Sequence, residues 1–215
     1  VGSEMCIRDS INIVDITNYV LLEWGQPLHA FDYDKLMARA GGKTPHIIVR
    51  PARAGEVLAT LDEGNKAAPL KLTPEMLIIS DEVGPIALAG IKGGADTMVT
   101  EATRNVLLES ANFDFISIRR TMKALNLPSE ASVRFSKGIH PETVKPAAER
   151  AAELMRQRGN ATVCRGIVDV YPRPLPPRVI DLKMVQVRRL LGMDLPRAEC
   201  VRILRALEFQ VEEVG

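Results

Sequence analysis

The feature that most constrains the fold of this chain is a series of short, β-rich segments in its middle third. HIIVRPA, GEVLATLD, PLKLT, EMLIISD, GPIALAG and RNVLLESA follow one another between residues 46 and 111, separated by Gly, Pro, Asp and Asn. Segments of this length and spacing predict strands that pair largely with their sequence neighbours. We therefore expect an α+β fold with a mixed or antiparallel sheet flanked by helices.

A helix is expected before these strands. Apolar residues from Ile11 to Trp24 recur at intervals of three and four, which is typical of an amphipathic helix. Gly25 and Pro27 end the pattern, so WGQPLHAFD is interpreted as a sharp turn after the helix. The single tryptophan, Trp24, is expected to lie in the core.

Helical periodicity returns after the strands in two places. The first is residues 114–125, with Asp114 as a candidate N-cap, and it is followed by the short segment SEASVRFSKG. The second runs from about 141 to 158, where Pro146 predicts a kink or a later start. One stripe of this helix is expected to face the core: Val144, Ala148, Ala151 and Met155. A final strand, ATVCRGIVDVY, is expected to close the unit.

A proline-rich segment marks the expected domain boundary. YPRPLPPR, residues 171–178, contains four prolines and predicts a semi-rigid extended linker. We expect one domain over residues 11–170 and the start of a truncated, winged-helix-like α/β module over 179–215. That module is expected to contain a strand, VIDLK, and helices over 184–191 and 196–207. Its many arginines predict solvated helix faces, with a nucleic-acid contact as the alternative.

The ends and the composition exclude several classes of protein. Residues 1–10, VGSEMCIRDS, resemble non-native read-through sequence and are left out of the fold prediction together with Cys6.

Three scattered cysteines without a CxxC motif argue against a disulfide framework and a zinc site, and favour a reducing compartment. The formal charge of +1 gives no global attraction to nucleic acid. No apolar run approaches the roughly 18 residues of a membrane-spanning helix.

Two polar features near the first helix are candidate site residues. Thr17 and Asn18 lie in mid-helix, where such residues are mildly unfavourable. They either bond to their own turn or serve a site. His29 follows the Gly–Pro break, and a lone histidine is structural unless a partner is found.

Two more candidates lie among the strands. ALAGIKGG places Gly90, Gly93 and Gly94 after a strand, where glycines either make a tight turn or expose backbone N–H groups to a ligand. In NVLLESANF, Glu109 shares a strand face with Leu107. A carboxylate in that position is costly to bury unless something bonds to it, so Glu109 lies either at an exposed edge or in a site.

Together these strings resemble a known family. NIVDITNYVLLEWGQPLHAFD, IALAGIKGG, LLESANFD and ASVRFSKGIHPE resemble the central editing region of the beta subunit of bacterial phenylalanyl-tRNA synthetase. LKMVQVRRLLGMDLPRAECVRILRALEFQVEE resembles the start of the next domain of that subunit, a small helix-turn-helix-like module. The similarity covers about residues 11–215 in order, so the chain is expected to be a fragment of such a subunit.

The resemblance implies a hydrolase that removes tyrosine wrongly esterified to tRNA(Phe). It implies that His29, helped by Thr17 and Asn18, positions water or the ester carbonyl without a covalent nucleophile. It also implies that Glu109 binds the tyrosine hydroxyl. The other pocket positions implied are Gly90, Gly93, Ser129, which is usually Thr in the family, and Ala131. The family usually has an Arg shortly before the NIVD run, but here that place falls in residues 1–10, where Arg8 is not a safe equivalent.

The same resemblance implies partners and cofactors. The partners would be the acceptor end of tRNA(Phe) and the alpha subunit, in a cytoplasmic heterotetramer of two alpha and two beta chains. ATP and magnesium would serve the synthetic reaction of the whole enzyme, so no metal or cofactor is expected in this fragment. One alternative is a non-catalytic tRNA-binding or subunit-scaffolding segment. Another is a freestanding relative acting on a different small ester, against which the linker and the second module argue.

Overall fold

The computed structural model describes residues 12–61 and 67–214. The expected non-native segment 1–10, with Cys6 and Arg8, lies outside the described residues, as does Ile11. The chain divides into two compact units, the first ending at Arg165 and the second beginning at Gly166. The division falls close to the expected end of the first domain at residue 170, and the detailed domain limits stay predictions.

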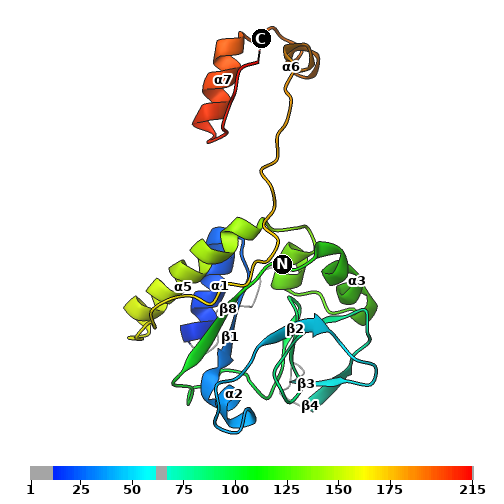
Figure 1. The fold of residues 1–215 in the computed structure, drawn as a ribbon, viewed down its shortest axis with the longest axis vertical. Helices are drawn as coiled ribbons and strands as arrows, with labels where there is room; N and C mark the ends of the chain where they lie inside the picture. The colour runs from blue at the N-terminus through cyan, green and yellow to red at the C-terminus, as the bar shows by residue number, and fades with distance from the viewer. Residues whose placement is uncertain (1–11, 62–66, 215) are drawn as a thin grey trace, which may run out of the picture. The chain divides into compact units, whose positions relative to one another are not determined.

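Every strand pair in the first unit is antiparallel. Four strands form a sheet in the order β2-β5-β6-β7, and two further ladders pair β1 with β8 and β3 with β4 (Figure 1). The strands are β1 (Leu28–Asp32), β2 (Ile48–Pro51), β3 (Val57–Leu61), β4 (Ala67–Lys71), β5 (Leu77–Ser80), β6 (Pro85–Leu88), β7 (Lys92–Gly93) and β8 (Val106–Ser110). The predicted α+β class with antiparallel strands is therefore confirmed.

The helices follow the predicted periodicity closely. They are α1 (Asn12–Trp24), α2 (Tyr33–Arg39), α3 (Phe115–Leu125), α4 (Glu130–Phe135), α5 (Val144–Arg158), α6 (Met184–Leu191) and α7 (Arg197–Ala206). The Asp114 carboxylate caps α3 by accepting from the Ser117 N–H. A 3-10 turn, Pro141–Thr143, precedes α5. The helix therefore starts later than residue 141, which is one of the two alternatives predicted from Pro146, and Pro146 lies in its first turn.

The interpretation of WGQPLHAFD as a turn is only partly right. Gly25, with φ +69°, ends α1, but LHAFD continues as strand β1 and α2 begins directly after it. The partner of β1 is β8, which lies far along the chain and pairs Leu28 with Ser110 and Asp32 with Val106. Local sequence gives no sign of this pairing, because the ladder partner of β1 is β8, and the end of β1 also bonds to the Thr97 carbonyl oxygen.

Two predicted strands are wrong. ATVCRGIVDVY and VIDLK carry β-rich patterns, yet neither segment is assigned as a strand and both are exposed to solvent. Val168 and Val179, for example, are 96% and 88% exposed. A β-rich segment forms no strand when there is no neighbouring strand to pair with it. Among the described residues, no strand lies beside either segment.

The β1–β8 ladder lies between two apolar cores. On one face, Leu28 and Leu108 pack against a small core that joins α1 to α5. On the other face, Phe31 and Leu107 belong to the main core under the four-stranded sheet, α3 and α4. Because side chains alternate along a strand, His29 and Glu109 lie on the main-core face.

Two expectations about the small core need correction. The buried stripe of α5 is Ala147, Ala151 and Met155, so Ala147 takes the place predicted for Ala148, while Val144 is only partly buried. Trp24 is 43% exposed and not in the core. It lies in the last turn of α1, one turn beyond Val20 on the same helical face, where the helix ends at Gly25.

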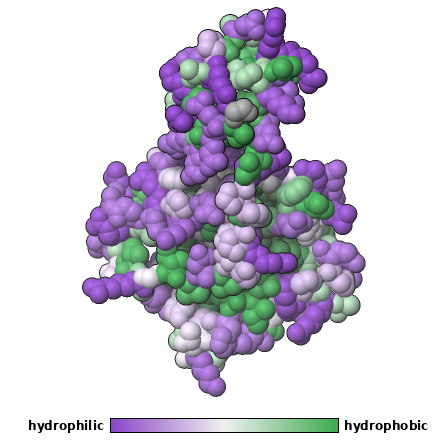
Figure 2. Space-filling model, turned by 45° about the horizontal axis from the view of Figure 1, so that its top comes forward, coloured by the Kyte–Doolittle hydropathy of each residue, from purple (hydrophilic) through white to green (hydrophobic). Residues whose placement is uncertain are grey.

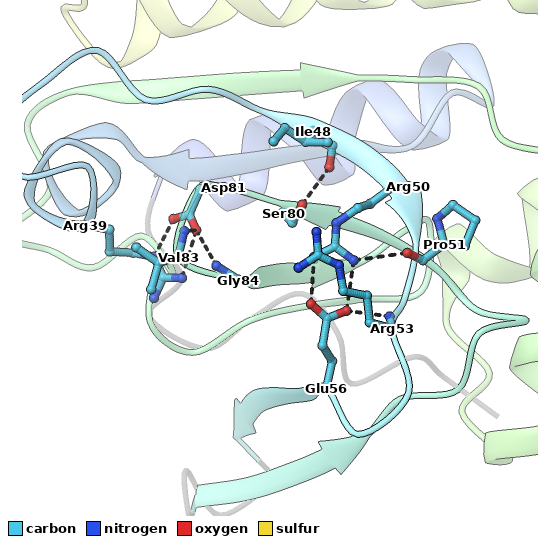
Figure 3. Close-up of polar contacts among 10 residues, drawn as sticks. All are labelled: Arg39, Ile48, Arg50, Pro51, Arg53, Glu56, Ser80, Asp81, Val83 and Gly84. Atoms are coloured by element: carbon cyan, nitrogen blue, oxygen red, sulfur yellow. Dashed lines mark hydrogen bonds and ion pairs between the residues drawn. The ribbon is translucent and has the colours of Figure 1, made fainter.

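Ion pairs brace the strands around the four-stranded sheet (Figure 3). Arg39 of α2 binds the almost fully buried Asp81 carboxylate, which also accepts from the Gly84 N–H in the β5–β6 turn. Arg50 of β2 holds Glu56 through two hydrogen bonds of 2.9 and 2.7 Å. The Asp81 contacts fix the β5–β6 hairpin that leads into the glycine-rich segment.

The surface of the larger unit carries a contiguous hydrophobic area on the face shown in Figure 2. Exposed apolar residues of the first unit include Ile48 and Val49 on the edge strand β2. None of the helices within the described residues is long and apolar enough to cross a lipid bilayer.

Candidate functional site

A cavity of about 80 Å³ lies where the β1–β8 ladder meets the glycine-rich segment after β6. A single water needs about 10–15 Å³ of such space, so the cavity accepts a larger group. Its walls are mostly apolar and come from β1, β5, β6, β7, β8 and α4. The lining residues are Pro27, Leu28, His29, Ile79, Ala87, Leu88, Gly90, Ile91, Lys92, Gly93, Glu109, Ala131 and Phe135.

His29 and Glu109 are direct partners across the antiparallel ladder. Residues paired in this way project their side chains from the same face, with Cβ atoms about 5 Å apart. The pairing therefore brings two residues that are distant in sequence into one cavity. Both residues are candidates from the sequence alone, but nothing in the local sequence predicts that they are neighbours.

Glu109 carries an unpaired carboxyl group at this cavity. It makes no hydrogen bond or ion pair with another described residue. The side chain keeps some accessible area, and the cavity walls raise the pKa of its carboxyl to about 7 by excluding water. Near neutral pH, Glu109 therefore both accepts and donates hydrogen bonds, and a hydroxyl group is a suitable partner for it.

His29 is held neutral at the same cavity. Burial lowers the pKa of its imidazole to about 4, so the ring is uncharged at neutral pH and one ring nitrogen is free to accept a proton. The ring contacts Phe31 edge-on, with centroids 4.5 Å apart. A neutral imidazole in a cavity has the properties of a general base or of a group that orients water.

Two glycines shape the wall opposite the ladder. A Cβ atom on Gly93 would lie 2.6 Å from Cε1 of His29, so the imidazole packs directly on the Gly93 backbone. Gly90 has φ +66°, and a Cβ there would lie 2.8 Å from the Phe135 ring and 3.0 Å from the Phe113 ring. Both positions exclude a side chain, Gly93 by contact and Gly90 by contact and backbone conformation.

Comparison with known proteins identifies the family. Residues 4–160 match the family described as the B3/4 domain, which is most of this chain. The chain belongs to the B3/4 domain family. Similar relatives are named phenylalanine–tRNA ligase beta subunits, and the predicted resemblance to that subunit is confirmed.

The relatives are much longer than this chain. The subunit of Dehalococcoides mccartyi is 47% identical over 203 residues, which are 94% of this chain and 24% of the relative. The subunit of Moorella thermoacetica is 45% identical over 97% of this chain and 25% of its own length. That of Bacillus licheniformis is 44% identical over 96% and 24%. The chain thus spans about a quarter of the length of the curated relatives it matches.

Of the remaining predicted site residues of this B3/4 domain, one lines the cavity and three do not. Ala131 lines it, whereas Ser129 is not among the lining residues and instead caps α4 and donates to the Ile91 carbonyl oxygen at 3.3 Å. Thr17 donates to the Val14 carbonyl oxygen in its own turn of α1, at 2.8 Å. Neither Thr17 nor Asn18 is among the described residues that line the cavity.

Gln26 is a structural residue that the sequence analysis missed. It is fully buried, and its amide nitrogen donates to the Ala111 carbonyl oxygen at 2.8 Å, while its amide oxygen accepts from the Thr143 hydroxyl at 2.9 Å. These bonds tie the start of β1 to the end of β8 and to the turn before α5. Gln26 therefore fixes the ladder that carries His29 and Glu109.

Opposite pH dependences are expected from the two cavity residues. The raised pKa of Glu109 means that its contribution to stability is present below about pH 4.5 and is lost as the pH rises to about 7. The lowered pKa of His29 means that stability is lost as the pH falls from about 6.5 to about 4. Relative to the wild type, Glu109→Gln should therefore gain stability as the pH rises through the first window. His29→Gln should gain stability as the pH falls through the second.

Urea unfolding at half-unit pH steps measures both differences. Subtraction of the wild-type curve removes the contribution of other carboxylates, such as Glu56, whose pKa is lowered to about 2 by its bond to Arg50. Parallel curves for wild type and Glu109→Gln between pH 4.5 and 7 would show that the carboxyl is not desolvated.

Proposed function

We propose that this B3/4 domain hydrolyses the ester between tyrosine and the 3′ end of tRNA(Phe), and so edits mischarged tRNA. The observation that carries the proposal is the placement of an unpaired Glu109 carboxyl directly across the ladder from a neutral His29. The two groups share a cavity whose other walls are mainly apolar. Such a cavity suits an aromatic ring that ends in a hydroxyl.

The chemistry of selection supports this assignment. Phenylalanine and tyrosine differ by one hydroxyl, and an apolar synthetic pocket rejects an added hydroxyl only about a hundredfold. A second site must therefore favour that hydroxyl. A carboxyl held in a desolvated cavity does so, because it stays unpaired when phenylalanine enters and gains a hydrogen bond when tyrosine enters.

Hydrolysis then requires one water and one proton acceptor. Water adds to the ester carbonyl carbon, the bond to the ribose oxygen breaks, and tyrosine and the free ribose hydroxyl are released. The neutral imidazole of His29 accepts the proton of the attacking water and returns it to the ribose oxygen, or orients the water while the terminal adenosine takes part. Thr17 and Asn18 lie outside the cavity lining, so we give them only a supporting part on α1.

The names of the relatives support a place for this chain in a larger enzyme. We propose that the chain is part of a phenylalanine–tRNA ligase beta subunit that works with an alpha subunit, as two of each, in the cytoplasm. ATP and magnesium would serve the synthetic site elsewhere in that enzyme. The acceptor end of tRNA(Phe) would enter the Glu109–His29 cavity.

The test is deacylation of tyrosyl-tRNA(Phe) by a full-length beta subunit assembled with its alpha subunit. We expect hydrolysis of tyrosyl-tRNA(Phe) at a kcat/KM about a hundredfold above that for phenylalanyl-tRNA(Phe), the effect of leaving one buried polar group unpaired. Release of labelled tyrosine is followed under single-turnover conditions, with uncatalysed ester decay as the reference. Decay no faster than that reference would reject the proposal and favour a non-catalytic tRNA-binding or scaffolding segment.

A further inference from the structure

We propose that Lys92 binds the phosphate group next to the aminoacylated adenosine, at the rim of the Glu109–His29 cavity. The inference deepens the proposed function and rests on it. It assigns a function to Lys92, which lies within the glycine-rich segment ALAGIKGG but was not among the site residues predicted from the sequence. The ligand chemistry is a singly charged phosphodiester, or a 5′-phosphate on a small substrate.

Lys92 occupies a special position in the cavity wall. It lies on β7, the edge strand of the four-stranded sheet, where it pairs with Leu88. Its neighbour Gly93 is the residue on which the His29 imidazole packs. Because side chains alternate along a strand, the Lys92 side chain leaves β7 on the side away from His29, although its residue still borders the cavity.

The charge of Lys92 has no partner within the described part of the chain. Lys92 makes no hydrogen bond or ion pair with another described residue, and it is the only lysine or arginine among the cavity-lining residues. The cavity lining therefore includes one lysine whose charge has no partner among the described residues.

The proposed substrate carries an anion beyond the ester, on the 5′ side of its terminal ribose. With the tyrosine hydroxyl at Glu109 and the ester at His29, the ribose and its 5′-phosphate remain outside the inner cavity. An ammonium group binds a phosphate oxygen as a point charge, without the fixed geometry of arginine. Lys92 should thus contribute to binding and not to the chemical step.

The experiment compares two amide-linked, non-hydrolysable ligands on the assembled enzyme: 3′-tyrosylamino-adenosine with and without a 5′-phosphate. The synthetic site is blocked by a phenylalanyl-adenylate analogue, and Kd is measured by calorimetry. In the wild type, the phosphate should tighten binding about fivefold, in line with one partly solvated ion pair. Lys92→Gln should lose this gain and Lys92→Arg should keep it, while the exposed Lys43→Gln serves as the matched control.

Kinetics supply the second measurement. For tyrosyl-tRNA(Phe), Lys92→Gln should raise KM with kcat unchanged, and the slope of log KM against log salt should fall by about 0.7. The same phosphate gain in Lys92→Gln as in the wild type would overturn the inference, and so would a fall in kcat. If the wild type hydrolyses no ester, the proposed function fails, and the phosphate-dependent difference in Kd still decides the part played by Lys92.

Discussion

Glu109→Ala is expected to lower kcat/KM for tyrosyl-tRNA(Phe) by about a hundredfold and to leave the slow rate with phenylalanyl-tRNA(Phe) unchanged. The reason is that Glu109 is an unpaired polar group in the wall of a mainly apolar cavity, and burial raises the pKa of its carboxyl to about 7. A hydrogen bond to such a group is made by tyrosine and not by phenylalanine. Single-turnover deacylation of both charged tRNAs by the assembled enzyme measures the effect.

Two further variants sharpen the result. Glu109→Gln keeps the shape and part of the hydrogen-bonding capacity, so its loss with tyrosyl-tRNA(Phe) should be smaller than that of Glu109→Ala. Glu101→Ala, at an exposed carboxylate, should behave as the wild type. An equal loss with both charged tRNAs would show that Glu109 supports the fold or the chemical step and does not select tyrosine.

His29→Ala is expected to lower kcat for tyrosyl-tRNA(Phe) by about a hundredfold, which is the lower end of the usual contribution of a positioned proton acceptor. Gly93→Ala should act through the same ring. Its added methyl group would lie 2.6 Å from Cε1 of His29 and must displace the imidazole, so we expect about a tenfold loss in kcat.

The chain offers a matched control for each of these variants. His46 is exposed and bonds to Glu82 away from the cavity, so His46→Ala should retain the wild-type rate. Gly84 has open space around its Cβ position, so Gly84→Ala adds a methyl group without a collision. A wild-type kcat in folded His29→Ala would assign proton transfer to the terminal adenosine of the substrate.

Much of the scaffold follows from local sequence. The apolar periods of α1, α3, α6 and α7 and the cap at Asp114 are local signals, and the structure has these helices where they were predicted. Glu109 was also accessible to physical reasoning, because strand alternation placed a carboxylate on the face of Leu107. The structure shows the consequence, which is an unpaired carboxyl beside the main core.

The remaining features of the fold and of the candidate site depend on contacts between residues that are distant in sequence. The segment LHAFD became a strand because β8 supplies its hydrogen bonds, and only that pairing places His29 opposite Glu109. VIDLK shows the converse, since a β-rich pattern without a partner strand stays unpaired and exposed. Lys92 and Gln26 were missed for the same reason, as their importance lies in a cavity and a cross-link that three separate segments build.

The most direct test of the account is a crystal structure of the assembled enzyme with 3′-tyrosylamino-adenosine bound. We predict that the tyrosine ring lies in the cavity between the β1–β8 ladder and the Gly90–Gly93 segment. Its hydroxyl should be within about 3 Å of the Glu109 carboxyl, with the amide that replaces the ester next to His29. A ligand bound in the editing domain with its ring outside this cavity, or with its hydroxyl away from Glu109, would contradict the account.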